Sequence, residues 1–163
     1  MRTVSISMLI CLISLASSAA QSTAQSEQER NKAVARSFFE NVLDQGHLNE
    51  YSDSHAANFV AHGGGRDYSL AEDMAAAREE RQALPDMRVI VNQLVAERDL
   101  VAVYWTAAGT NTHEGMGFPA TGKKLTVPGM TLFRFQAGKI TEEWSVYDML
   151  GAMRQAGLLP AGR

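Results

Sequence analysis

Residues 124–147, KLTVPGMTLFRFQAGKITEEWSVY, decide the fold of this chain. Residues 124–136 and 139–147 both alternate apolar and polar side chains, which is typical of strands with one buried face. The inward faces that this alternation predicts are Leu125, Val127, Thr131, Phe133 and Phe135 on the first strand, and Ile140, Trp144 and Val146 on the second. Ala137-Gly138 between them is a tight turn, so the two strands are expected to pair antiparallel.

The residues before this hairpin predict two further strands, 87–96 and 100–109, and helices ahead of them. We expect helices at 26–45, 48–56, 69–83 and 149–156, and a short strand at 58–62. Ser26 and Ser69 are each followed three residues later by Glu, the pattern of a helix-starting capping box. Helices that precede an antiparallel sheet indicate an α+β fold, here a cone-shaped curved sheet packed with N-terminal helices around an apolar pocket.

The N-terminus has the features of a secretory signal. Arg2 is followed by an apolar run, residues 8–16, which is too short to span a bilayer, and then by small residues up to Ala20. We therefore expect a signal peptide at 1–20, cleaved after Ala20 or Ala24, and a periplasmic or secreted protein. A disordered lead-in is expected at 21–25, one domain at 26–159 and a tail at 160–163.

Composition and missing motifs exclude several classes of protein. With 15 Lys+Arg against 18 Asp+Glu, the net charge is −3, which argues against a nucleic-acid partner. The segment 117–124 resembles a phosphate-binding loop, but it lacks the final Ser/Thr and is followed by a strand. The sequence contains no GxSxG turn and no HExxH pair, so neither a serine hydrolase nor a metal site is predicted.

Asp148 and His62 are the candidate catalytic residues. Asp148 shares parity with Trp144 and Val146, so it is expected beside apolar side chains that raise a carboxyl pKa and suit it to proton transfer. It also directly precedes a helix, where Asp is a good N-cap. His62 ends the short strand, and it fits either a pocket imidazole or a surface residue before the glycine turn.

Several other side chains are candidates to contact a substrate. His113 lies in the loop 111–122, which is expected to overhang the pocket, although a plain loop residue fits the same pattern. Aromatic and methionine side chains form the core, and some of them must line any pocket. From this set we select Tyr104, Phe133, Met130 and Trp144.

Three ordered segments resemble the SnoaL-like polyketide cyclases, which have the nuclear-transport-factor-2-like fold. They are GFPATGKK at 117–124, FRFQAGKI at 133–140 and EWSVYD at 143–148, and the resemblance extends over about residues 28–159. It implies a cone of curved sheet and helices, and ring closure by intramolecular aldol addition without metal or cofactor. It also implies that Asp148 is the general acid/base and that His62 is the pocket histidine.

Asn111 stands where many relatives carry a histidine, and its amide is suited to hold a substrate oxygen rather than to relay a proton. The sequence therefore predicts cofactor-independent acid/base chemistry, of cyclase, isomerase or lyase type, on a small apolar or polyketide-like carbonyl compound. A non-catalytic periplasmic protein that binds small hydrophobic ligands is the alternative. After signal removal no membrane contact is expected, and pairing through the outer sheet face predicts a homodimer.

Overall fold

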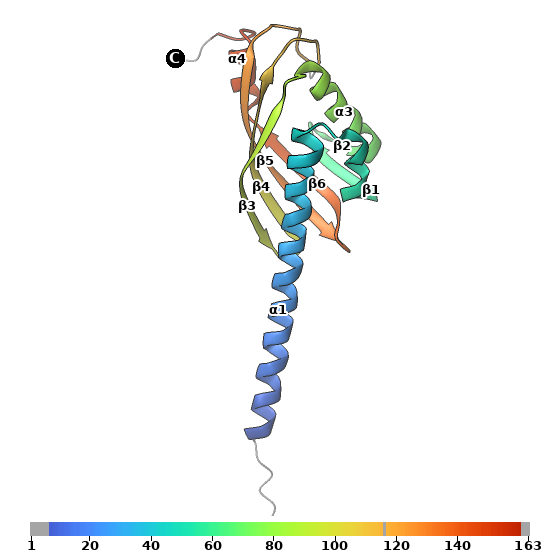
Figure 1. The fold of residues 1–163 in the computed structure, drawn as a ribbon, viewed down its shortest axis with the longest axis vertical. Helices are drawn as coiled ribbons and strands as arrows, with labels where there is room; N and C mark the ends of the chain where they lie inside the picture. The colour runs from blue at the N-terminus through green and yellow to red at the C-terminus, as the bar shows by residue number, and fades with distance from the viewer. Residues whose placement is uncertain (1–6, 116, 161–163) are drawn as a thin grey trace, which may run out of the picture.

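The computed structural model describes residues 7–115 and 117–160, with side chains from residue 22 onward (Figure 1). In chain order the elements are α1 (Ser7–Ser37), the π-helical segment η1 (Phe38–Asp44), η2 (Leu48–Glu50), α2 (Tyr51–Ser54), β1 (His55–Gly63), β2 (Arg66–Ser69), α3 (Leu70–Ala83), β3 (Arg88–Glu97), β4 (Leu100–Thr110), β5 (Lys124–Gln136), β6 (Lys139–Tyr147) and α4 (Met149–Gln155). Among the described residues, none of the helices is both long and apolar enough to cross a membrane.

One six-stranded sheet, in the order β2-β1-β6-β5-β4-β3, curves around the helices. Neighbouring strands are antiparallel except for β1 and β6, which run parallel. The predicted α+β fold is confirmed, as is the β5–β6 hairpin, whose turn residues Ala137 and Gly138 both have positive φ. The sequence did not predict β2, a four-residue strand at the sheet edge.

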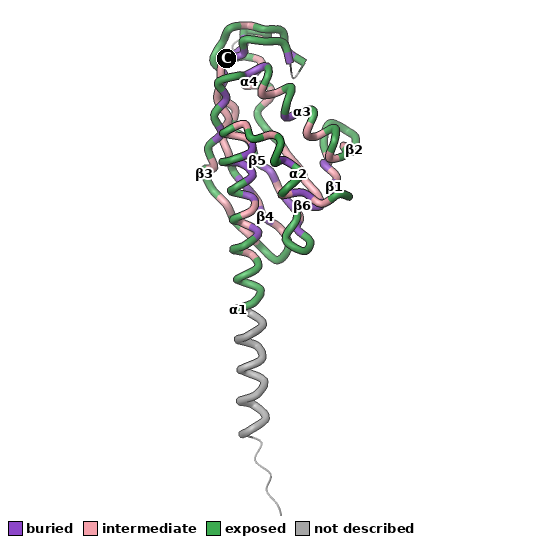
Figure 2. The backbone as a smooth tube through the Cα atoms, turned by 45° about the vertical axis from the view of Figure 1, so that its right-hand side comes forward, coloured by how far each residue is buried: buried purple, intermediate pink, exposed green. Residues whose placement is uncertain are grey.

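The helices lie on the concave side of the sheet, where the core is built. Phe38 and Phe39 of η1 are buried, and each ring centroid lies 6.0 Å from that of Phe133 on β5. Figure 2 shows the buried segments where the strands meet the helices. Phe133 is fully buried at the centre of this contact, because consecutive aromatic residues of η1 both reach the sheet.

The two expected capping boxes have different outcomes. At Ser69 the box forms as predicted: the serine side chain accepts from the Glu72 backbone N–H, and the Glu72 side chain accepts from the Ser69 N–H. Ser26, in contrast, lies inside α1, and its hydroxyl donates to the Thr23 carbonyl. Residues 20–30 are rich in Ala, Gln and Glu, which favour helix, so the helix runs through this point.

The expected disordered lead-in, 21–25, therefore belongs to α1. Residues 1–6 of the expected signal peptide and residues 161–163 of the expected tail lie outside the described residues. Signal cleavage and export remain predictions.

A bulge in β6 reverses the side-chain alternation that the sequence predicts there. Phe135 pairs with Ile140, but the next pair is Arg134 with Glu142, so Thr141 is an extra residue in β6. An extra residue moves every later side chain to the opposite face. The inward orientation predicted for Trp144 and Val146 is therefore wrong, and the Val146 side chain is 70% exposed.

Candidate acid/base site

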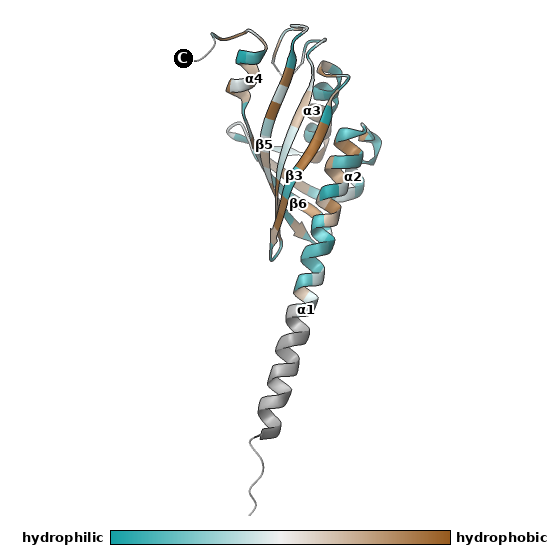
Figure 3. Cartoon of the chain, turned by 60° about the vertical axis from the view of Figure 1, so that its left-hand side comes forward, coloured by the Kyte–Doolittle hydropathy of each residue, from teal (hydrophilic) through white to brown (hydrophobic). Residues whose placement is uncertain are grey.

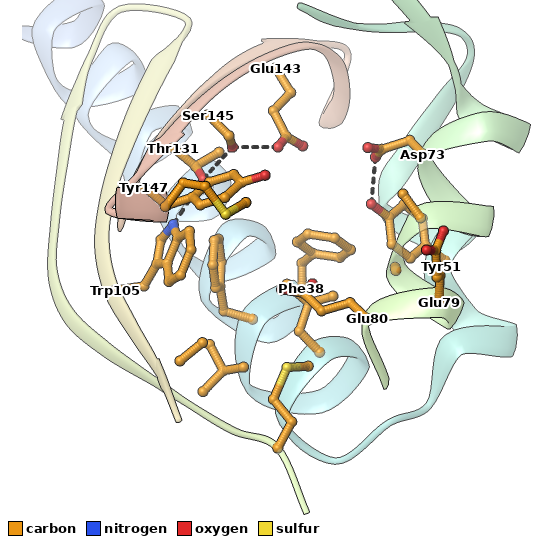
Figure 4. A pocket seen from close by; sticks show the side chains of 18 residues that line it. Phe38, Tyr51, Asp73, Glu79, Glu80, Trp105, Thr131, Glu143, Ser145 and Tyr147 are labelled. Carbon is orange, nitrogen blue, oxygen red and sulfur yellow. Dashed lines mark hydrogen bonds between the residues drawn. The ribbon is translucent and has the colours of Figure 1, made fainter. Parts of the chain in front are cut away.

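A cavity of about 310 Å³ lies between the concave face of the sheet and the segments η1, α2 and α3 (Figure 4). A volume of this order suits a small organic ligand. Its apolar walls are mainly aromatic: Phe38, Phe39, Tyr51, Trp105 and Tyr147. Hydrogen-bonding groups on β5, β6 and α3 interrupt these walls, so the cavity is apolar with a few polar points.

The β6 bulge gives the cavity its acidic group. Because of the extra residue at Thr141, Glu143, Ser145 and Tyr147 all line the cavity. The opposite wall comes from α3, where Asp73 and Glu80 are seven residues apart and therefore share one face of the helix. Figure 4 shows the carboxyls of Glu143 and Asp73 pointing toward each other from these two walls.

A chain of hydrogen bonds fixes the Glu143 carboxyl. The Trp105 Nε1–H donates to Thr131 Oγ1 at 2.9 Å, the two hydroxyls of Thr131 and Ser145 are 2.7 Å apart, and Ser145 Oγ donates to Glu143 Oε1 at 2.6 Å. The indole N–H is only a donor, so the Thr131 hydroxyl accepts from it and donates its own hydrogen bond to Ser145 Oγ. Glu143 Oε1 is thus an acceptor, which leaves Oε2 as the oxygen that carries a proton.

The cavity favours the protonated form of Glu143. Burial raises the pKa of this carboxyl to about 8, the Asp73 carboxyl adds to the rise, and the Ser145 hydrogen bond opposes it. Burial also raises the pKa of Asp73, against the hydrogen bond that it accepts from the Tyr51 hydroxyl. Each carboxyl therefore disfavours ionisation of the other.

Glu79 and Glu80 of α3 also line the cavity, and burial raises the pKa of Glu80 as well. The neighbouring Arg81 does not line the cavity, because its guanidinium donates to the carbonyls of Leu43, Asp44 and Met87. The described residues contain no group of three or more His, Cys, Asp or Glu placed to hold a metal ion.

None of the eight site residues predicted from the sequence lines this cavity. Asp148 is exposed and caps α4, with its Oδ1 accepting from the Gly151 N–H at 2.8 Å. It lies in a shallow groove on the outer face together with Tyr104 and Met130, which are 41% and 51% exposed. Asp148 is therefore the N-cap of α4, which is the second role that its position in the sequence suggests.

His62 also lies away from the cavity. Its Nδ1 is 2.7 Å from Asp67 and its Nε2 3.2 Å from Glu142, and its ring stacks on Trp144 with centroids 4.8 Å apart. The hydrogen bond to Asp67 is the main cause of its raised pKa. Trp144 and Glu142 follow the outward parity of β6 beyond the bulge, so this group belongs to the outer face.

The loop residue Asn111 has a structural environment. It is fully buried: its Oδ1 accepts from the Thr121 N–H and hydroxyl, and its Nδ2 donates to the His113 carbonyl. The backbone N–H of His113 in turn contacts the Ala83 carbonyl at the end of α3. Asn111 thus organises the loop, and the remaining candidate, Phe133, packs in the core.

The residues that line the cavity left only weak signals in the sequence. Asp73 and Glu80 have the spacing of one helix face, and this spacing is compatible with an acidic wall on that helix. Glu143 gave no signal, because regular alternation places it on the outer face. Tyr147, at the end of β6, is on the cavity face for the same reason as Glu143.

The comparisons with known proteins agree with the fold. No curated protein matches this chain. Solved structures that are similar include AclR from Streptomyces galilaeus, which is 24% identical with a TM-score of 0.76 over 83% of this chain and 86% of that one. IdmH from Streptomyces antibioticus is 24% identical with a TM-score of 0.69, over 78% and 98% of the two chains.

A SnoaL-like polyketide cyclase from Agrobacterium tumefaciens is 21% identical, with a TM-score of 0.61 over 72% of this chain and 91% of that one. At these identities the structural matches show a shared fold. The sequence model of the SnoaL-like polyketide cyclases matches residues 33–156, which is most of the chain. The chain therefore belongs to the SnoaL-like polyketide cyclase family.

Proposed function

We propose that this chain is an acid/base catalyst that acts on a small, largely apolar carbonyl compound, with Glu143 as the proton-transferring group. The observation that supports this most is the state of Glu143: a buried carboxyl, its pKa raised to about 8, with one oxygen fixed by Ser145 and the other facing the cavity. A carboxyl with a pKa near the working pH is effective both in accepting and in returning a proton.

In the proposed reaction the Glu143 carboxylate removes a proton from the carbon next to a substrate carbonyl. The electron pair of the broken C–H bond moves to the carbonyl oxygen and forms an enolate. The Tyr147 hydroxyl, which lines the cavity, is the group proposed to donate to that oxygen. A donor aimed at a developing negative charge lowers the barrier of such a step.

The enolate carbon then attacks a second carbonyl of the same molecule, which forms the new C–C bond and closes a ring. Glu143 returns its proton to the alkoxide that this attack creates, so the enzyme ends in its starting state. Ring closure is the expected outcome because the chain belongs to a family of polyketide cyclases. Return of the proton to a different carbon gives an isomerase by the same first step.

The base can be tested without knowing the natural substrate. Nitrobenzisoxazole is a small aromatic compound whose ring C–H proton leaves to a base while its N–O bond breaks, giving a coloured nitrile-bearing phenolate. We expect the full-length protein to accelerate this reaction, with a rate that rises with pH through about 8 as Glu143 ionises. Glu143→Gln should remove the acceleration.

The matched control is Glu142→Gln, which changes the adjacent carboxyl on the outer face. It should keep the wild-type rate and pH profile. A wild-type rate no higher than that of Glu143→Gln would contradict the proposal, and would favour a cavity that only binds its ligand.

We also propose that the chain forms a homodimer through the outer face of the sheet and that residues 1–20 direct its export. Support for the dimer comes from Tyr104, Met130 and Val146, which are register partners on β4, β5 and β6 and are 41%, 51% and 70% exposed. Figure 3 brings this side forward, with apolar segments on β3 and β5. Contiguous exposed apolar surface of this kind is typical of an interaction face. Support for export comes from the sequence alone.

A further inference from the structure

The charge of the cavity is one-sided. Among the described residues that line it, the ionisable groups are Asp73, Glu79 and Glu80 on α3, Glu143 and Tyr147 on β6, and Tyr51 on α2. None of them carries a positive charge, and the nearby Arg81 directs its guanidinium to backbone carbonyls instead. An anionic ligand would meet the carboxyls of Asp73, Glu80 and Glu143 with no positive side chain among the described lining residues, so the lining disfavours it.

The Glu80 carboxyl accepts no hydrogen bond from the described side chains, and no ion pair joins it to another of them. It lines the cavity, where burial raises its pKa; the positive charge of Arg81, whose guanidinium donates to backbone carbonyls, opposes this rise without cancelling it. A carboxyl in this state is costly to ionise unless a cation or a donor approaches it. Asp73 has one donor, the Tyr51 hydroxyl, and burial raises its pKa too.

The remaining walls also suit a cation. The rings of Phe39, Trp105 and Tyr147 surround the same space, with centroids of Phe39 and Trp105 6.0 Å apart and of Trp105 and Tyr147 6.4 Å apart. Aromatic faces attract ammonium groups and also accommodate an apolar body. Acidic and aromatic walls around one cavity are thus complementary to a molecule with a positive end and an apolar end.

We propose that the ligand of this cavity is an apolar molecule that carries a protonated amine, with the ammonium at the acidic wall formed by Asp73 and Glu80. The cavity lining alone supports the binding of such an amine. That the bound amine is also the substrate rests on the proposed function. The apolar body then lies against Trp105 and the η1 phenylalanines, within reach of Glu143.

Binding of such a cation is linked to proton release. The empty cavity favours protonated carboxyls, whereas an ammonium beside them stabilises their ionised forms. The amine itself stays protonated, because alkylamines have pKa values of about 10. The affinity should therefore rise as the pH is raised toward 8, and protons should be released as the amine binds.

Calorimetry with three probes of one shape tests this proposal. Naphthylmethylamine, naphthylmethanol and naphthoate present a cation, a neutral group and an anion on the same ring system. For the full-length protein at neutral pH, we expect the amine to bind about tenfold more tightly than the alcohol. A tenfold change in affinity corresponds to the free energy of a shift of one pKa unit. Naphthoate should bind most weakly. Titrations in two buffers of different ionisation enthalpy should show proton release with the amine.

Variants locate the effect. Asp73→Asn and Glu80→Gln should each reduce the preference for the amine over the alcohol, whereas Glu142→Gln on the outer face should leave it unchanged. Equal affinities for amine and alcohol, absence of amine binding, or amine binding without proton release would overturn the proposal. The result is independent of turnover: an amine preference without Glu143-dependent nitrobenzisoxazole reaction would defeat the proposed catalysis alone.

Discussion

Two adjacent glutamates of β6 illustrate how surroundings decide the chemistry of a side chain. Glu142 faces outward, and the hydrogen bond from Arg134 at 2.7 Å is the main cause that lowers its pKa. Glu143 faces the cavity, and its burial raises its pKa to about 8. The pKa values of these two glutamates differ by more than those of an ordinary Asp and an ordinary Glu, so a search by residue type alone does not distinguish them.

Asp148 gives a residue-scale test of the distinction between a cap and a catalyst. Asp148→Ala removes the acceptor of the Gly151 N–H, so we expect the free energy of unfolding in urea to fall by about 1 kcal/mol. Asp148→Asn, which keeps a good capping side chain, should remain close to wild type. Both variants should retain the nitrobenzisoxazole rate. Loss of that rate with unchanged stability would make Asp148 catalytic, as the family resemblance implies.

At the scale of elements, the β6 bulge separates what the sequence predicts from what it does not. Alternation correctly places β5, because its strand is regular, and Trp105 rather than Tyr104 faces inward on β4. In β6 alternation assigns the side chains after Thr141 to the wrong face of the sheet. The bulge is a property of how β6 pairs with β5. The sequence of β6 alone does not show that one of its residues will have no partner on the neighbouring strand.

The two serine-based capping boxes give the same lesson for helices. Their local patterns are alike, yet only Ser69 begins a helix. The residues before Ser69 form β2 and pair with β1, so the helix has to start there. Those before Ser26 favour helix and have no competing partner. A start signal therefore acts only where the preceding chain is held in another conformation.

The loop candidate Asn111 shows why the site was harder to predict than the fold. Its amide fits a substrate contact by chemistry alone, but the structure buries it among the backbone groups of residues 113 and 121. The fold follows from periodicity, which a sequence displays directly. The lining of a cavity depends on which faces several elements turn toward one another, and no single segment displays that.

For the whole molecule, the sheet has two faces with different proposed uses. The concave face carries the cavity, and the convex face exposes Tyr104, Met130 and Val146. Met130→Lys places a charge at the centre of that exposed row, so we expect light scattering after size exclusion to show a monomer, because burying an unpaired charge is costly. Met130→Leu should stay dimeric. A monomeric wild type would contradict the proposed pairing.

The proposed function depends on one carboxyl of the cavity, Glu143, exchanging its proton near neutral pH. Carbon NMR of the glutamate carboxyls, followed across pH in the full-length protein, measures this directly, with the Glu143 signal identified by its loss in Glu143→Gln. We predict a midpoint for Glu143 near pH 8, and for Glu142 a midpoint below the usual range of a glutamate. A Glu143 midpoint close to the ordinary value of 4.5 would contradict it.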